Sequence, residues 1–559
     1  MKTSKFFLAF VIVLTLCLFN CKKTVEELST INAPAVKTAF VVQIFDAATQ
    51  ELIGMKSGQE IKVTILGTDK NLVSDIFGRS VTSLSTHQGI ISLSIAGTTT
   101  PSADNPVDFV VDLSCDGYLH GSLPIRIASE GGHSFIARLV DPKNPPEGVS
   151  VFEGVVGRTL IDGTLENKID VSTPPVQQTM ATTHVVIAEG TKILDESGTP
   201  LSGDLTFLIA YYSNQSPIAL DCFPGSFCVK TDEGGMQGKG LFFSGGWADY
   251  ELSDQSGRVA KTFSKPISLT IDVPPNTYNP ETKAKIKTGD YYPIWNYRYS
   301  DGVWEYENEG LLQGPSGNGN YYVEYQASHF SLKNVDWYTW NDILMITEYL
   351  MFKSSLANSQ FQVGRRYLKN LPFGNKSITV TTDSIDIPNI SIARVIFKEQ
   401  TTGFIYWSSG YLESLGDNFY IPDGPCKLPT EIEVWGGCPY SKLGSILVDN
   451  ICDEDSFSIP LKFTKQPAGQ IMNVDFSLTV NCEFARLRPN ISAFYDDGCG
   501  WKYIGQVING HITVPGLETG KGYSFGVWLE DKWFDEFYTI DKTSYTWSID
   551  LPESVCNKY

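Results

Sequence analysis

Histidines are the first candidates for acid–base or metal chemistry in this sequence, and the six present are scattered as His87, His120, His133, His184, His329 and His511. No two have the spacing of a metal-ligand pair, and the sequence contains neither a Gly-x-Ser-x-Gly turn nor a His-Glu-x-x-His motif. Because catalytic triads assemble in space, an enzyme that cleaves glycans or proteins stays open as one alternative. The sequence favours a protein that is not an enzyme, with no catalytic residues and no cofactor.

Two acidic clusters could supply oxygen ligands for calcium, namely Asp453 to Asp455 and Asp496 with Asp497. Their spacing matches no known calcium loop, so a solvated acidic turn is the favoured interpretation of each. The chain as a whole is acidic, with 63 Asp and Glu against 43 Lys and Arg. Such a chain repels phosphate backbones, which argues against a nucleic-acid partner.

Cysteines offer disulfide or metal chemistry. Cys115 stands alone and is expected to be a buried free thiol, whereas Cys222 and Cys228 flank a Pro-Gly turn and are expected to pair. Six more lie near the C-terminus: Cys426, Cys438, Cys452, Cys482, Cys499 and Cys556. No Cys-x-x-Cys occurs and only His511 lies among them, so disulfides are favoured over zinc, with a connectivity that the sequence leaves open.

Aromatic residues form two dense clusters, at 291–306 and 501–538. Exposed rings would suit a sugar or a protein partner, but rings alternating along one strand face also suit a sandwich core. Which way the rings point decides between these interpretations. The candidate binding residues are Tyr291, Trp295, Tyr297, Trp304, Trp501, Trp528 and Trp533.

The N-terminus carries an export signal: Lys2 and Lys5 precede an uncharged apolar run at residues 6–19. That run is shorter than the roughly 20 residues that a transmembrane helix needs, although a short membrane anchor is the alternative. The sequence Leu-Phe-Asn-Cys at 18–21 resembles the lipobox of bacterial lipoproteins, departing from it in the residues just before the cysteine. The resemblance implies that residues 1–20 are removed and that Cys21 carries palmitate-type chains. The protein would then be held on the outer membrane, facing the periplasm or the exterior.

Strand patterns dominate the rest of the chain. Residues 61–65 and Ile267–Val273 alternate with the period of a half-buried strand. A polar tether is expected at 21–37, and the proline-rich stretch at 142–146 separates a first sandwich at 38–145 from a larger sandwich region at 150–340. Residues 341–375 are expected to be a connector.

An internal repeat organises the C-terminal part. Pro422 precedes Trp435 by the same interval by which Pro515 precedes Trp528, and the Ser-Ile-Pro-Leu that begins at Ser458 matches a Ser-Ile-Asp-Leu further on. The period is the size of one small sandwich. Two repeated sandwiches are therefore expected, at 376–465 and 466–559.

Four stretches resemble known domain families. Residues 38–145 and the two repeats resemble carboxypeptidase-regulatory-like or prealbumin-like sandwiches, on turns such as Asp-Gly-Tyr at 116–118. The run from Val185 to Ser331, with its Phe-Pro-Gly turn, resembles the ZU5/GAIN-like β-sandwich. Some GAIN-like proteins cleave themselves at a histidine motif, which His329-Phe330-Ser331 matches loosely. His329 is nevertheless expected to be an ordinary hydrogen-bonded or core histidine.

Together these patterns predict an all-β chain: a linear array of about four β-sandwich domains, Ig-like or prealbumin-like, after a lipoprotein signal. We expect a non-enzymatic lipoprotein that displays modules for binding or adhesion at the cell surface. The alternatives are a glycan-binding lipoprotein of a polysaccharide-uptake system and the enzyme named above. The expected partners are the membrane through its lipid anchor, and a glycan or another envelope protein.

Overall fold

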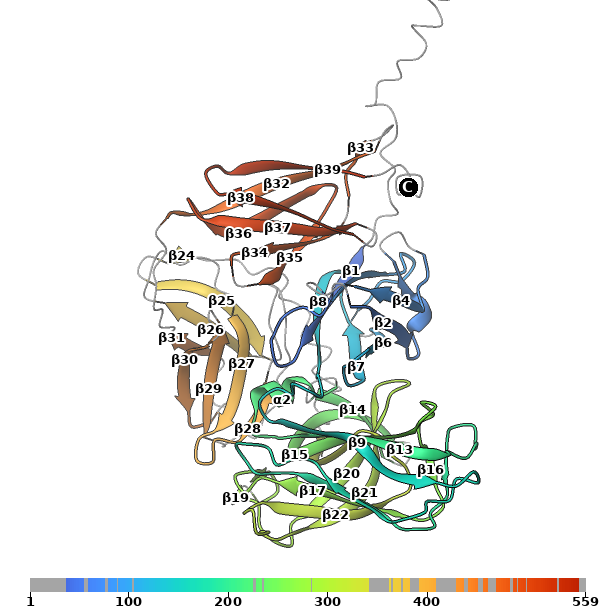
Figure 1. The fold of residues 1–559 in the computed structure, drawn as a ribbon. Coiled ribbons are helices and arrows are strands. Elements are labelled where there is room, and N and C mark those ends of the chain that lie inside the picture. The colour runs from blue at the N-terminus through green and yellow to red at the C-terminus, as the bar shows by residue number, and fades with distance from the viewer. Residues whose placement is uncertain are drawn as a thin grey trace, which may run out of the picture.

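The computed structural model describes residues 37–340 except 55–58, 76–78, 88, 103–104, 225–227, 234–235 and 283, and residues 361–551 except 363–364, 374–375, 383–391, 409–428, 437–440, 451–455, 461–468, 483–485, 490, 499 and 530–531. Almost every element is a strand (Figure 1). The helical elements described are α2 (Pro217–Asp221) and a 3-10 turn, η1 (Lys70–Leu72). No helix in the described ranges is long and apolar enough to span a membrane. The expected export signal, Cys21 and most of the expected tether lie outside the described residues.

The first unit, residues 38–139, is a sandwich of two four-stranded sheets. One sheet has the order β3 (Val73–Ser74), β5 (Ile90–Ile95), β1 (Thr38–Asp46) and β8 (Gly131–Leu139), with β1 and β8 parallel. The other has the order β4 (Ser83–Thr86), β2 (Ile61–Leu66), β6 (Val107–Cys115) and β7 (Gly121–Ile127). The predicted alternation is present in β2, whose Ile61, Val63 and Ile65 are buried while Lys62 and Thr64 are exposed.

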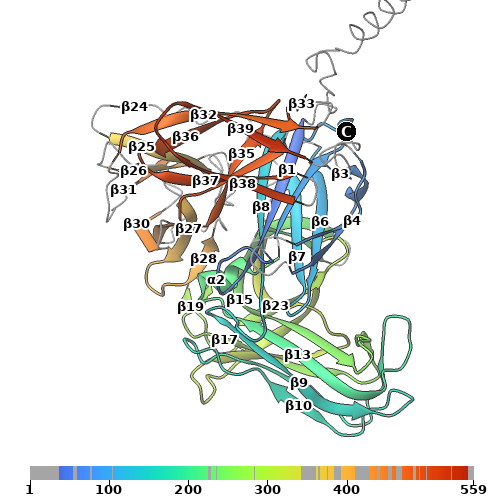
Figure 2. The same ribbon diagram turned by 45° about the horizontal axis from the view of Figure 1, so that its top comes forward.

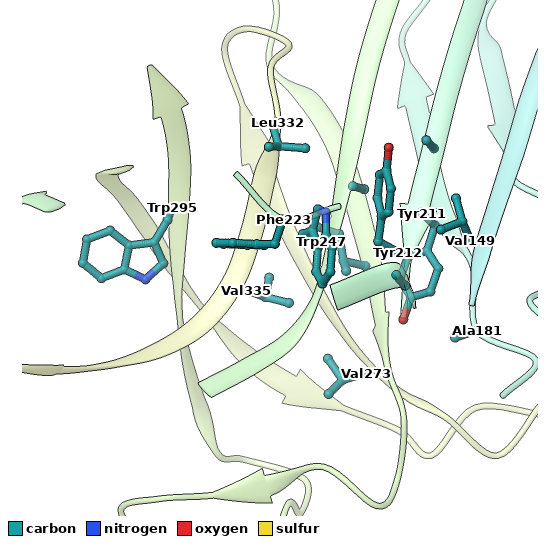
Figure 3. Packing of buried hydrophobic residues seen from close by; sticks show 14 of the residues in the cluster. Val149, Ala181, Tyr211, Tyr212, Phe223, Trp247, Val273, Trp295, Leu332 and Val335 are labelled. Carbon is teal, nitrogen blue, oxygen red and sulfur yellow. The ribbon is translucent and has the colours of Figure 1, made fainter. Parts of the chain in front are cut away.

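The second unit, residues 149–340, is built on one eleven-stranded sheet. Its path runs through β10 (Ile169–Ser172), β11 (Thr183–Ile187), β17 (Ile267–Val273), β22 (Tyr321–Ala327), β21 (Val303–Gln313), β20 (Tyr291–Arg298), β23 (Lys333–Trp340), β15 (Met236–Asp254), β13 (Gly203–Tyr212) and β9 (Val149–Thr159), and β14 (Cys228–Glu233) pairs with β15 and β21. Two short ribbons complete the unit: β12 (Ile193–Leu194) with β16 (Thr262–Phe263), and β18 (Tyr278–Asn279) with β19 (Ala284–Lys285). In its core Trp247 lies between Tyr212 and Phe223, with ring centroids 5.1 and 5.0 Å away (Figure 3).

The third unit, residues 361–460, and the fourth, residues 471–550, share the strand order of one sheet and a parallel strand pair in the other. In the third, the sheet β24 (Phe361–Gln362), β25 (Arg365–Phe373), β26 (Lys376–Thr382), β31 (Ser456–Pro460) faces the sheet β28 (Ile405–Ser408), β27 (Ile392–Glu399), β29 (Thr430–Gly436), β30 (Ser441–Val448). In the fourth, β33 (Arg486–Leu487), β32 (Ile471–Asn481), β36 (His511–Glu518) and β39 (Ser544–Asp550) face β35 (Trp501–Val507), β34 (Ile491–Asp496), β37 (Gly522–Leu529), β38 (Lys532–Thr539).

The internal repeat is confirmed by strand pairing. The two Ser-Ile segments lie in β31 and β39, which pair in parallel with β26 and β32. Trp435 lies in β29 and Trp528 in β37, the third strands of the equivalent sheets. The first unit has the same parallel pairing of its first and last long strands, which extends the likeness beyond the repeat that the sequence indicates. β24 and β25 fall within the stretch expected to be a connector.

The first three units share buried surface. One apolar cluster contains the core of the second unit, residues of the third such as Phe397 and Tyr406, and Leu119 of the first. At the centre of this junction, Asp221 at the end of α2 is paired with Arg138 of β8, 3.5 Å away, and with Arg394 of β27. All three charged side chains are at most 3% exposed. Breaking such a buried cluster is costly because a lone charge would remain without water.

The fourth unit packs back onto the first (Figures 1 and 2). Phe494 of β34 is fully buried in a cluster with Val41 and Phe45 of β1. This contact explains why β1 does not alternate: its other apolar face belongs to the first unit's own core, so the strand is buried on both sides. The all-β fold of several sandwiches is confirmed. The expectation that they lie in a linear array needs correction, because the fourth unit folds back to meet the first.

Candidate functional site

A cavity of about 220 Å³ lies where the first and second units meet, with Ser408 of the third on its wall. The first unit contributes the stretch 119–124 and the C-terminal end of β8, and the second contributes the end of α2, the turn after it and part of β15. Close packing surrounds it: the Ser122 and Tyr297 hydroxyl oxygens are 2.8 Å apart across the two units. A side chain at Gly302 would lie 2.9 Å from Pro124, so only glycine allows this approach.

The titratable groups of this cavity come from both units. The Nε2 atom of His120 lies 2.8 Å from Asp112 Oδ1, and the His120 ring is 4.9 Å from the ring of Tyr299. Burial opposes the charge on His120, but the hydrogen bond and the charge of Asp112 leave its pKa raised. Asp249 has its pKa raised to about 6, first by burial and then by the neighbouring Glu251.

Cys222 also lines the cavity, and the expected disulfide with Cys228 is wrong. Cys222 is a free thiol whose Sγ lies 3.4 Å from the carbonyl oxygen of Ile218, one turn earlier in α2. Cys222 caps the end of α2, whereas Cys228 begins β14 after the turn. Burial raises the pKa of Cys222 to about 12, so the thiol stays protonated at neutral pH and is a poor nucleophile.

The remaining cysteines divide into two groups. Cys115 is a buried free thiol as predicted, with its pKa raised to about 11 by burial and by Asp116. Cys482 is disulfide-bonded. The others of the C-terminal set, Cys426, Cys438, Cys452, Cys499 and Cys556, lie outside the described residues. Their connectivity stays a prediction.

The aromatic candidates of the second unit are core residues rather than a surface platform. Trp295 and Tyr297 are 2% exposed and Trp304 is fully buried, because β20 and β21 turn this face toward Phe242 and Phe223. Tyr291 differs: it is 55% exposed at the start of β20, opposite Leu311 of β21. The idea that this cluster forms a binding platform is therefore corrected for all but Tyr291.

The aromatic candidates of the fourth unit lie at its contact with the first. Trp501 and Trp533 are partly buried, with ring centroids 4.7 Å apart in an edge-to-face arrangement. Both pack against the cluster that joins Phe494 to β1. The side chain of Trp528 is not among the described ones. These rings therefore serve a contact between units of the chain itself.

His329 is a hydrogen-bonded histidine, as expected. Its Nε2 atom lies 3.2 Å from Asn296 Oδ1 and 3.2 Å from the Nζ atom of Lys333. Burial lowers the pKa of His329, and the charge of Lys333 lowers it further. Sequence patterns gave no reason to single out Lys333, Asn296 or Glu307, which the strand pairing brings together around it.

The two acidic clusters are the remaining candidates. Asp496 accepts hydrogen bonds from the backbone of Gly498 at 2.7 Å and Gly500 at 3.0 Å, which makes this cluster an acidic turn. The cluster at 453–455 lies outside the described residues. Among the residues that the structure describes, no three His, Cys, Asp or Glu side chains are grouped as metal ligands would be.

Comparisons with known proteins find little. No protein-family profile matches the sequence, and no curated protein does. The major pilin SpaD of Corynebacterium diphtheriae aligns with 92% of this chain and 97% of its own, at 8% identity and a TM-score of 0.13. BcpA, the major pilin subunit of Bacillus cereus, covers 92% and 98% at 7% identity and a TM-score of 0.14. A DUF3823 family protein of Parabacteroides merdae covers 42% and 89%, at 8% identity and a TM-score of 0.12. Scores this low carry no argument about function.

Proposed function

We propose that this chain is a non-enzymatic, envelope-anchored lipoprotein that holds a β-sandwich platform away from a membrane and presents it for binding or adhesion. The observation that carries the proposal is the direction in which β1 runs through the molecule. β1 is nine residues long and ends beside the second unit, since Ala47 belongs to that unit's core. A strand of this length spans about 30 Å. Thr38, where the expected tether would join β1, therefore lies at the end of the first unit that is far from the second unit.

Rigid packing supports the same role. Three units meet at Asp221, and the fourth closes against β1, so the chain forms one block instead of a flexible string. The second unit lies at the end of this block opposite the fourth unit in both views (Figures 1 and 2). Partners would meet the second unit first, and it carries the exposed apolar loop residues Leu160 and Ile161, which are 51% and 92% exposed.

The cavity at the junction favours a structural role over catalysis. Arg138 of the first unit pairs with Asp221 of the second, His120 pairs with Asp112 inside the first unit, and the thiol of Cys222 is held protonated. A glycan-binding protein stays the second candidate through Tyr291, since the other candidate rings of that cluster, Trp295, Tyr297 and Trp304, are buried.

The anchor is tested by metabolic labelling of cells with palmitate. We expect label on the wild-type chain and none on Cys21→Ala, which would also leave the membrane fraction. Cys17→Ala is the matched control, because it lies within the apolar run and should keep both label and location. An unlabelled wild-type chain would contradict the anchor.

Display is tested on intact cells with a protease and with a glycan array. We expect external protease to reach the loop at 160–163 before the strands of the first unit. Replacing Ile161 by Asp should reduce adhesion of cells to a protein-coated surface without changing expression. A specific signal on the glycan array that is lost in Tyr291→Ala would instead favour the glycan-binding alternative.

A further inference from the structure

A fully buried lysine lies directly opposite an asparagine in the second unit. Lys333 opens β23 and pairs in register with Asn296 of β20. Lys333 is 0% exposed, and its Nζ atom lies 3.3 Å from Asn296 Oδ1. Lysine is almost never buried to this degree without a specific reason.

Glu307 is aimed at this pair by an irregularity in the sheet. Ile294 pairs with Asn308 and Trp295 with Tyr306, so Glu307 is the extra residue of a β-bulge in β21. A bulge redirects a side chain relative to its neighbours. The Glu307 Oε2 atom lies 2.5 Å from Lys333 Nζ, within reach of a proton on the amine.

The surroundings favour attack by the amine on the amide. Burial lowers the pKa of Lys333, although Glu307 acts in the opposite direction, and the neutral amine is the nucleophilic form. Ser331 donates a hydrogen bond to Asn296 Oδ1, and His329 Nε2 lies 3.2 Å from the same oxygen. Donors at a carbonyl oxygen stabilise the negative charge that develops there during acyl transfer.

We propose that Lys333 and Asn296 become joined by an amide bond within the chain. The Nζ lone pair forms a bond to Cγ of Asn296, and Glu307 accepts a proton from Nζ. The Cγ–Nδ2 bond then breaks as Glu307 returns that proton to Nδ2, and ammonia leaves. One amide replaces another, so the reaction needs no oxidant, reductant or co-reactant.

Such a bond would lock the centre of the large sheet. β20 and β23 are adjacent in the sheet, and β21 and β22 lie between them in sequence. A covalent link between the two strands restricts the unfolded chain, in the way that a disulfide does. This inference is independent of whether Cys21 carries a lipid.

Peptide mapping of the full chain, purified in detergent, tests the bond. Trypsin does not cut after an acylated lysine, so the linked chain should give one branched peptide that joins residues 288–298 to residues 299–353. Its mass should be that of the two segments less one ammonia. Separate peptides 299–333 and 334–353, with no branched species in the folded wild-type chain, would overturn the proposal.

Variants separate the roles of the residues. Lys333→Arg and Asn296→Ala should give no branched peptide, and Glu307→Gln should give little or none at times when the wild type is complete. Lys398→Arg is the matched control, because Lys398 also contacts a buried carboxylate, Glu433, at 2.8 Å. It should keep the full yield of the link between 296 and 333. Formation of the link at the wild-type rate in Glu307→Gln would overturn the part assigned to Glu307.

Discussion

Two regions of the chain are equally rich in aromatic residues, yet these residues are buried by different parts of the molecule. One region comprises β20 and β21, and the other comprises β34, β35 and β38. Trp295, Tyr297 and Trp304 fill the interior of one unit. Phe494, Trp501 and Trp533 are covered by another unit, through β1. Burial inside a unit is needed for folding, whereas burial between units fixes only their arrangement. The two regions should therefore respond differently to the same substitution.

The largest effect is expected inside the second unit. Trp304→Ala removes a fully buried ring that is stacked on Phe223, 4.9 Å between centroids. Loss of such a ring costs about 3–5 kcal/mol of unfolding free energy, measured by urea denaturation. Tyr291→Ala, at an exposed site on the paired strand, should change stability by less than about 0.5 kcal/mol. Equal losses for the two variants would contradict the assignment of Trp304 to the core.

Next in size is the charge cluster between units. Asp221→Asn leaves Arg138 and Arg394 buried without their carboxylate, at a cost of about 3 kcal/mol. We expect a lower urea midpoint and faster proteolysis between the units. Asp170→Asn is the control, since Asp170 pairs with Lys168 and His184 on the surface, where a pair contributes about 0–1 kcal/mol. An Asp221→Asn protein as stable as this control would show that the cluster is dispensable.

A smaller effect is expected at the contact between the fourth and first units. Trp533→Ala removes a partly buried ring and should cost about 1–2 kcal/mol. The clearer readout is shape: small-angle X-ray scattering should show a larger radius of gyration as the fourth unit separates from β1. Phe537→Ala, on the same strand but 65% exposed, should leave the radius unchanged. A compact Trp533→Ala protein would place the main contact elsewhere.

Strand periodicity was enough to predict the fold class and the repeat. Ile267–Val273 alternates as a strand with one core face, and the matched Ser-Ile segments occupy equivalent strands. These features depend on neighbours in the sequence or on copies of a pattern. The packing of whole units against one another depends on neither of these, and for that reason a linear array was expected. The sequence of β1 carried part of this signal, since the four successive apolar residues at 39–42 indicate that both faces of the strand are covered.

The candidate sites were harder to predict for the same reason. Aromatic density cannot separate a core from a platform, because both place rings on one strand face. The Lys333 cluster depends on a register between β20 and β23 and on a bulge at Glu307, and neither is encoded in local spacing. A cysteine pair six residues apart was a poor guide, because Cys222 belongs to a helix end.

The smallest effect concerns the pH dependence of the contact between the first two units. The pKa of His120 is raised in the folded chain by Asp112, although burial opposes it. A raised histidine pKa adds stability that is fully present below the pKa of the unfolded state, near 6.5, and that is lost as the pH rises through the folded value. His120→Gln should therefore lower the urea midpoint at pH 5 and have no effect at pH 9.

Part exposure keeps this contribution below about 1 kcal/mol, so it is best measured as a difference between paired variants. Asp112→Asn removes the partner that holds the proton, 2.8 Å from His120 Nε2. Adding His120→Gln to that variant should produce no further pH dependence, because the two substitutions remove the same interaction. Additive effects would mean that Asp249 and Glu251, the other acids that raise the pKa of His120, sustain its charge across the junction.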